Sequence, residues 1–135
     1  MNKKIGFVIL TVVLLLLVGC GPSVDQAKTQ FCSDWNALGT AIQNAKGLNE
    51  NSTVEEAKAA QDEIAKAFDK AKSSAAQLQD VQLEATETAL NAVTQTIDSI
   101  PEEATLGQAG AAIQVSVNAF ETAYTAVNTT VCVAR

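Results

Sequence analysis

Side chains able to do chemistry are few in this chain of 135 residues, and the most informative are its three cysteines. Cys20 ends an apolar run near the start, whereas Cys32 and Cys132 lie near the two ends of the remaining sequence. The sequence contains no His, the commonest general base and metal ligand in proteins. Ser and Cys therefore lack their usual activating partner, and two thiols alone do not complete a tetrahedral metal shell. We expect no catalytic site, no metal and no cofactor.

The carboxylates do not change this expectation. Glu84 and Glu87 lie three residues apart and would share a helix face. Metal bundles bridged by carboxylates also need Glu-x-x-His pairs, and this chain has none. Gly107 and Gly110 follow no predicted strand and are too close together to form a phosphate-binding loop. We interpret Glu84 and Glu87 as part of a solvated face.

The start of the chain has the features of an export signal. Lys3 and Lys4 precede an apolar run from Ile5 to Val18, and a basic start followed by such a run is typical of signal peptides. The run has 14 residues and would span about 21 Å as a helix. That is short of the roughly 30 Å hydrocarbon core of a bilayer, so a permanent membrane span is not expected.

The end of this run, Leu17-Val18-Gly19-Cys20, resembles the lipobox of bacterial lipoproteins. The resemblance implies that residues 1–19 are a cleaved signal peptide and that Cys20 becomes the first mature residue. Its thiol would carry diacylglycerol, and its new amino group could be acylated. Two or more acyl chains anchor a protein stably. We therefore expect a lipid-anchored protein on a bacterial cell membrane, facing outside the cytoplasm, with a short tether over residues 20–23.

The charge of the mature chain makes the lipid its main link to the membrane. Loss of Lys3 and Lys4 with the signal leaves 7 basic and 15 acidic side chains, a net charge of −8. Such a surface does not attract anionic lipid. Because it could not neutralise a run of phosphates either, we expect no nucleic acid partner.

Cys32 and Cys132 form an even pair in a compartment that permits disulfides. One bridge between them would close a loop of about 100 residues and stabilise the fold by up to about 4.7 kcal/mol in the chain-entropy model. The alternative is two unpaired buried thiols.

Apolar residues recur at helical spacing along the mature chain, with steps of three and four. The four stripes run from Phe31 to Ala45, from Ala57 to Leu78, from Leu83 to Ile100 and from Leu106 to Val131. Gly47 and the polar residues after it end the first helix. Ser52 or Thr53 can cap the second helix and Asp80 the third, and Pro101-Glu102-Glu103 is typical of a first helical turn.

No Gly or Pro interrupts residues 54–99, so the second and third stripes could belong to one long helix. The apolar face argues against this reading. Continued past Leu78 it would reach Gln82 and Ala85, whereas the third stripe runs through Leu83 and Thr86. The face therefore slips by one residue near 79–80, which favours a break.

An even number of antiparallel helices would also bring Cys32 and Cys132 to one pole, as a bridge requires. We therefore predict an all-α fold, an up-down-up-down four-helix bundle over residues 24–135 with short connections. The bridge would staple the first helix to the last.

Aromatic residues occur as i,i+4 pairs on the first and last stripes, namely Phe31 with Trp35 and Phe120 with Tyr124. Stripes at helical spacing normally pack against each other, so we interpret these side chains as core. If the bridge sets the register, Trp35 should lie near residues 127–131. The alternative is an aromatic-lined pocket for an apolar ligand or lipid.

The short tether orients the bundle. Residues 21–23 reach about 10 Å at most, so the pole with Cys32 and Cys132 should face the lipid. The connections near 47–53 and 98–110 then point away from it. Acidic residues there suit helix N-termini, and the same geometry makes these loops a candidate partner surface, with Glu50, Asn51, Glu102 and Glu103 as its residues.

Two functions are consistent with these observations. The first is a non-catalytic interaction module at the cell envelope, anchored in the membrane and binding another envelope protein. The alternative is a carrier or sensor that holds a small apolar ligand between its helices. The mature part is similar to small exported helical proteins with one Cys near the start of the first helix and one near the end of the last, a likeness that implies no particular activity.

Overall fold

The computed structural model describes residue 21 and residues 23–133, without the side chain of Gln108. The predicted signal peptide over 1–19 and the predicted lipidation site Cys20 lie outside the described residues.

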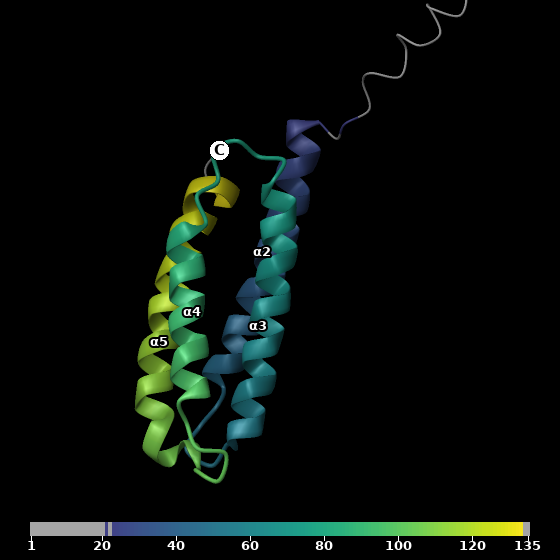
Figure 1. Ribbon diagram of the computed structural model, residues 1–135. Helices are drawn as coiled ribbons and strands as arrows, with labels where there is room; N and C mark the ends of the chain where they lie inside the picture. Colours follow the sequence, from purple (N-terminus) through teal and green to yellow (C-terminus); the bar gives the residue numbers. More distant parts are fainter. Residues whose placement is uncertain (1–20, 22, 134–135) are drawn as a thin grey trace, which may run out of the picture.

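Within the described residues the fold is four α-helices and a closing π-helical turn (Figure 1). These elements are α2 (Val24–Lys46), α3 (Val54–Ala75), α4 (Glu84–Asp98), α5 (Leu106–Val127) and η2 (Asn128–Val133). Successive helices run antiparallel, which confirms the predicted all-α four-helix bundle. α2 packs mainly on α3 and α4 mainly on α5, so the bundle is built from two helical hairpins.

The bundle has two distinct poles. The tether pole contains the start of α2, the 76–83 connection and η2, and the far pole contains the connections 47–53 and 99–105. Figure 1 shows the chain entering α2 at the same pole where η2 ends. This arrangement follows from the even number of antiparallel helices.

Local hydrogen bonds begin the first two helices of the bundle. Ser23 Oγ accepts from the Gln26 amide at 3.3 Å, and the Gln26 side chain accepts from the Ser23 amide at 3.1 Å. Thr53 and Glu56 form the same reciprocal arrangement, at 3.1 and 2.8 Å. Of the two predicted caps of α3, Thr53 is therefore the one used, and its capping box satisfies two otherwise free amides.

The prediction that Asp80 caps the third helix is wrong. The break near residues 79–80 is real, but α4 begins only at Glu84, after the N-cap Leu83. Leu78, Val81 and Leu83 are half-buried and pack against the core. Because these side chains must reach the core while the chain crosses between hairpins, the segment stays non-helical past Asp80.

The prediction of a first helical turn at Pro101-Glu102-Glu103 is also wrong. α5 starts at Leu106 with Thr105 as its N-cap. The Ala104 amide donates to the Pro101 carbonyl at 2.9 Å, which makes this stretch a tight turn. Leu106 is buried, so the helix begins where the chain re-enters the core.

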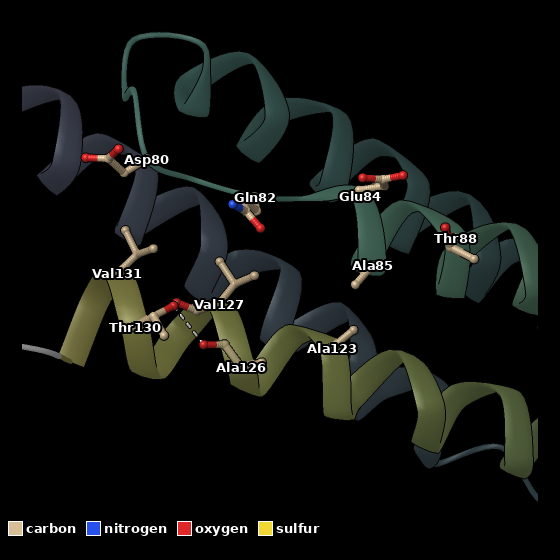
Figure 2. Close-up of a pocket in the computed structure, with 10 residues that line it drawn as sticks. All are labelled: Asp80, Gln82, Glu84, Ala85, Thr88, Ala123, Ala126, Val127, Thr130 and Val131. Atoms are coloured by element: carbon tan, nitrogen blue, oxygen red, sulfur yellow. Dashed lines mark hydrogen bonds between the residues drawn. The ribbon is translucent and has the colours of Figure 1, made fainter.

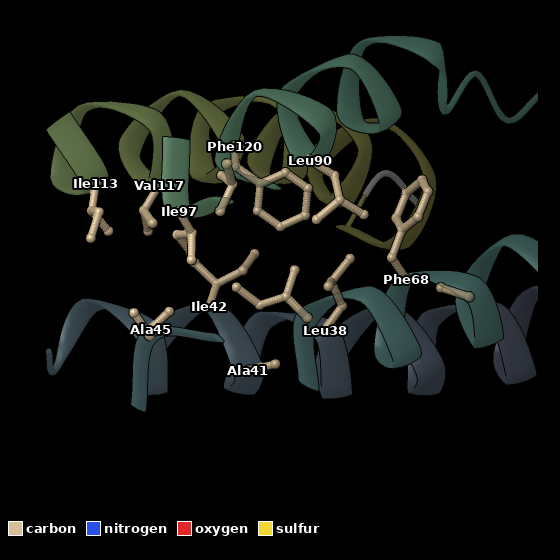
Figure 3. Packing of buried hydrophobic residues seen from close by; sticks show 14 of the residues in the cluster. Leu38, Ala41, Ile42, Ala45, Phe68, Leu90, Ile97, Ile113, Val117 and Phe120 are labelled. Atoms are coloured by element: carbon tan, nitrogen blue, oxygen red, sulfur yellow. The ribbon is translucent and has the colours of Figure 1, made fainter. Parts of the chain in front are cut away.

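The core is aliphatic with a few aromatic rings (Figure 3). Figure 3 shows Leu38 and Ile42 of α2 facing Ile97 of α4 and Phe120 of α5. Thr86 and Leu90 are buried while Ala85 is exposed, so the predicted one-residue slip of the apolar face is confirmed.

Cys32 and Cys132 form a disulfide, with Cα atoms 5.6 Å apart. The bridge ties α2 to η2 at the tether pole. The predicted staple is confirmed, and the alternative of two unpaired thiols is not observed.

Candidate functional site

The two connections of the far pole are paired with each other. Thr53 and Thr105 form an isolated antiparallel bridge, and the Leu106 amide donates to the Ser52 carbonyl at 3.3 Å. Each residue is also the N-cap of its helix, Thr53 for α3 and Thr105 for α5. The helices therefore hold the two loops in one fixed arrangement.

The first of these loops is also fixed internally. The Asn51 amide donates to Asn49 Oδ1 at 2.9 Å, and the Ser52 amide donates to the Asn49 carbonyl at 2.9 Å. The Asn49 amide donates to Ser52 Oγ at 3.2 Å. Such side-chain turns replace the hydrogen bonds that a loop would otherwise make with water. Glu50 and Asn51 thus stand on an ordered base.

The structure places all four predicted partner-surface residues at the far pole. Glu50, Asn51, Glu102 and Glu103 are exposed, the first two on the 47–53 connection and the others on the 99–105 connection. Residues about 50 positions apart in the sequence are thus brought to one end of the bundle.

The far pole is acidic because its cations are engaged. Lys58 Nζ lies 3.1 Å from Glu102 Oε1. Lys46, which ends α2, instead bonds Glu121 on α5 at 2.7 Å. That hydrogen bond and charge lower the pKa of Glu121, outweighing the effect of partial burial. Among the described residues, Glu50 and Glu103 have no ion pair.

A shallow notch lies beside Glu50 and was not predicted. It has a volume of about 220 Å³ and lies between residues 48–50 and the start of α5. The Gln114 side chain donates to the Leu48 carbonyl at 3.5 Å across it. Because the notch depends on how the ends of two helices meet, no local sequence pattern could indicate it.

The predicted aromatic residues form core, as interpreted from their spacing. Phe31, Trp35 and Phe120 are fully buried, and Trp35 stacks on Tyr124 with ring centroids 5.3 Å apart. The Tyr124 ring is half-buried, and burial raises the pKa of its hydroxyl. The rings pack on one another, and none of them lines the notch beside Glu50 or either of two grooves at the tether pole. The contact of Trp35 with Tyr124 lies before the predicted range 127–131.

One buried carboxylate connects the two helices of the first hairpin, and its burial was not predicted from the sequence. Asp34 is 3% exposed and accepts hydrogen bonds from Gln30 at 3.0 Å and from Ser74. Lys70 Nζ lies 3.1 Å from its other oxygen. Burial alone would raise the pKa of Asp34, but these hydrogen bonds and the Lys70 charge together hold the pKa below its ordinary value. The cluster links α2 to α3 and is structural in character.

The carboxylates Glu84 and Glu87 belong to the surface, as predicted. Both are exposed, and Glu87 pairs with Lys72 of α3 at 2.8 Å. Within the described part of the chain, no group of three Cys, Asp or Glu side chains could hold a metal ion.

Apolar surface is hollowed at the tether pole, along the open seam between α4 and α5 (Figure 2). This groove has a volume of about 780 Å³. Its walls are small or aliphatic side chains, Ala85, Ala123, Ala126, Val127 and Val131. Figure 2 shows Asp80, Gln82 and Glu84 along its polar edge. The side chains here differ from those of the far pole, because the acidic residues Asp80 and Glu84 border an apolar groove.

A second groove adjoins the first around Asp80, Thr130 and Val131, which line both. It has a volume of about 500 Å³ and lies beside Val24, the first residue of α2. Among the described helices, none is long and apolar enough to cross a membrane.

Comparison with known proteins adds no assignment. The chain matches no family model, no curated protein and no solved structure.

Proposed function

We propose that this protein is a lipid-anchored, non-catalytic interaction module at the outer face of a bacterial cell membrane. Cys20 would hold the tether pole at the lipid, and the far pole would bind another envelope protein. The observation that carries the proposal is the pairing of the two far-pole loops, which presents Glu50, Asn51, Glu102 and Glu103 together.

The separation of the two poles supports this assignment. The chain enters α2 three residues after Gly21, at the pole stapled by Cys32 and Cys132. The far pole lies at the other end of helices of 22 and 23 residues, or roughly 33 Å away at 1.5 Å per residue. A partner could therefore reach the acidic loops without competing with the membrane.

The rigidity of the loops supports a binding role as well. Ordering a flexible loop on binding costs free energy, so a surface that is already ordered binds with less loss. Exposed carboxylates without ion pairs favour a partner with a basic surface and give a binding rate that falls with salt.

The experiment starts with the mass of the mature amino-terminal peptide, which reports whether Cys20 carries lipid. A photo-crosslinking amino acid is then placed at Asn51 or Glu103 in cells, with Asn91 on the exposed side of α4 as the matched control position. We expect one recurrent envelope protein to be captured from the two far-pole positions and not from Asn91.

Charge reversal separates binding from folding. With the crosslinker at Asn51, Glu50→Lys with Glu103→Lys should abolish capture while the unfolding transition stays the same, and Glu63→Lys, at an exposed position on α3, should leave capture intact. Equal capture by the parent protein, the double variant and Glu63→Lys would contradict the proposal.

The groove between α4 and α5 favours a second candidate, a carrier or sensor for a small apolar ligand. Its aliphatic walls and volume of about 780 Å³ fall in the range of small-molecule sites. Native mass spectrometry of the Cys20→Ser protein would show a bound lipid or other apolar molecule if this candidate is right. Substitution of Ala126 by Gln should then release it.

A further inference from the structure

The groove beside Val24 has the chemistry of a site for hydrocarbon. Val24, Leu78, Val81 and Val131 contribute apolar walls from three separate segments of the tether pole. Val24 is 74% exposed. A polar side chain would serve equally well at this first position of α2, so the fold itself does not require an aliphatic residue there. Leu78, Val81 and Val131 are half-buried against the core and form the floor of a hollow of about 500 Å³, and polar side chains (Lys28, Gln77, Gln79, Asp80 and Thr130) form the rest of its lining. Water-accessible apolar surface at the bottom of such a hollow favours an apolar occupant.

The lipid expected on Cys20 is attached within reach of this groove. Cys20 is four residues before Val24, and four extended residues span at most about 14 Å. We propose that one acyl chain of the diacylglyceryl group on Cys20 lies in this groove, against Leu78, Val81 and Val131. The inference rests on the lipidation of Cys20 in the proposed function.

The charges at the groove favour a neutral occupant over an anionic phospholipid. Lys28 and Asp80 both line the groove, so its rim has one charge of each sign. A diacylglyceryl thioether is neutral and needs no counter-charge, whereas an anionic phosphate would meet Asp80 as well as Lys28. The covalent tether also gives the anchor's own chain a high effective concentration at the groove, of millimolar order for short flexible linkers.

The driving force comes from the groove walls. An acyl chain that moves from the bilayer to the groove exchanges one apolar environment for another, so its own transfer contributes little. The water-accessible parts of the groove walls lose their contact with water, which is favourable in proportion to the apolar area covered. Seating one chain also fixes the bundle relative to its anchor, because the lipid then contacts α2, the 76–83 connection and η2 together.

A photoactivatable anchor tests the proposal directly. Cells are grown with a diazirine fatty acid, and the full lipidated protein is purified and placed in vesicles of unlabelled phosphatidylcholine, so that only the anchor carries the label. The mass of the amino-terminal peptide is measured before irradiation. After irradiation and digestion, we expect the acyl chain of Cys20 to be joined within the same molecule to residues 77–81 or 130–133.

Matched variants control for chance contacts. Val81→Gln with Val131→Gln should lower the intramolecular cross-link yield several-fold, and Val115→Gln should leave it unchanged because Val115 is an exposed valine outside this groove. Thermal unfolding shows whether each variant is folded. A parallel sample of Cys20→Ser protein in diazirine-labelled phosphatidylcholine vesicles reports binding of bilayer lipid.

The outcomes separate the two proposals. An unmodified Cys20 overturns the lipid anchor, and the inference with it, before any irradiation. A lipidated Cys20 whose label reaches only phosphatidylcholine overturns the groove assignment alone. Labelling of the groove from the bilayer in the Cys20→Ser sample, with none from the anchor, also overturns it and assigns the groove to membrane lipid.

Discussion

The indole of Trp35 lies almost parallel to the ring of Tyr124, with 9° between the planes, and its Nε1 donates to the Tyr124 carbonyl at 3.2 Å. This pair joins α2 to α5 just before the chain changes from α-helix to the π-helical turn that carries Cys132. The Tyr124 carbonyl also accepts from the Asn128 amide, so the indole bond adds to the helical hydrogen bond there and does not replace it. The Trp35–Tyr124 contact and the disulfide thus fix the same end of α5.

The hydroxyl end of the Tyr124 ring lies against Gly39, and this close approach predicts a clash with any side chain added there. A Cβ at Gly39 would lie 2.9 Å from Tyr124 Cζ and closer still to its hydroxyl. Gly39→Ala should gain about 1 kcal/mol of helix propensity and lose more through overpacking, which typically costs about 1–3 kcal/mol. We expect a net loss of stability, measured by urea unfolding.

The same substitution made in a Tyr124→Leu background isolates the cause. Without the ring, Gly39→Ala should become neutral or stabilising, because only the propensity effect remains. An equal loss in both backgrounds would show that the cost does not arise from the contact with Tyr124.

Removal of the disulfide should weaken the whole bundle. The bridge joins residues 100 positions apart in the sequence. Loss of a native disulfide typically lowers the unfolding free energy by about 2–5 kcal/mol. We expect Cys32→Ser with Cys132→Ser to lower the unfolding free energy within that range. Asn91→Ser, at an exposed position on α4 away from the bridge, is the control and should unfold like the parent protein. A double variant as stable as this control would refute the expectation.

Much of the fold could be predicted from the sequence because apolar spacing determines which helix faces are buried. The slip of the apolar stripe separated α3 from α4, and the even helix count placed Cys32 and Cys132 together. The helix starts were less predictable. Asp80 and Pro101 have good first-turn chemistry, yet packing of the half-buried Leu83 and the buried Leu106 on the core fixes where α4 and α5 begin.

The candidate surfaces were predictable only in part. Exposure of Glu50, Asn51, Glu102 and Glu103 followed from their place in polar connections. The Thr53–Thr105 bridge that joins those loops did not, because it pairs residues 52 positions apart. The two tether-pole grooves likewise arise where a long helix, a short helix and a connection meet, and no local pattern encodes such a junction.

The buried Asp34 makes stability depend on pH. Its carboxylate accepts hydrogen bonds from Gln30 and Ser74 and pairs with Lys70, and its pKa is lower in the folded state. Its contribution is therefore fully present above the unfolded pKa of about 3.9 and is lost as the pH falls through the lower, folded value. Asp34→Asn should cost about 1–3 kcal/mol at pH 7, and the difference from the parent should shrink below about pH 4.

Urea unfolding at pH 7, 5 and 3 measures this dependence. Asp62→Asn, at an exposed position on α3, is the control and should follow the parent at every pH. A cost for Asp34→Asn that stays constant down to pH 3 would show that the charge of Asp34 is not what stabilises the hairpin.

Thr86 offers the opposite kind of change, a substitution that should stabilise the fold. It is fully buried on α4, and its hydroxyl has no hydrogen-bond partner within the described residues. Burying an unpaired hydroxyl costs about 1–3 kcal/mol, whereas Val has nearly the same shape without the polar atom. Thr86→Val should raise the unfolding free energy by about 1 kcal/mol or more.

Thr88→Val is the control. Thr88 is two residues further along α4 and is exposed, so its hydroxyl is free to bond water and the substitution should have little effect on the unfolding free energy. A loss of stability in Thr86→Val would mean that the hydroxyl bonds a group in the folded protein, and a polar partner would then have to be sought beside α4.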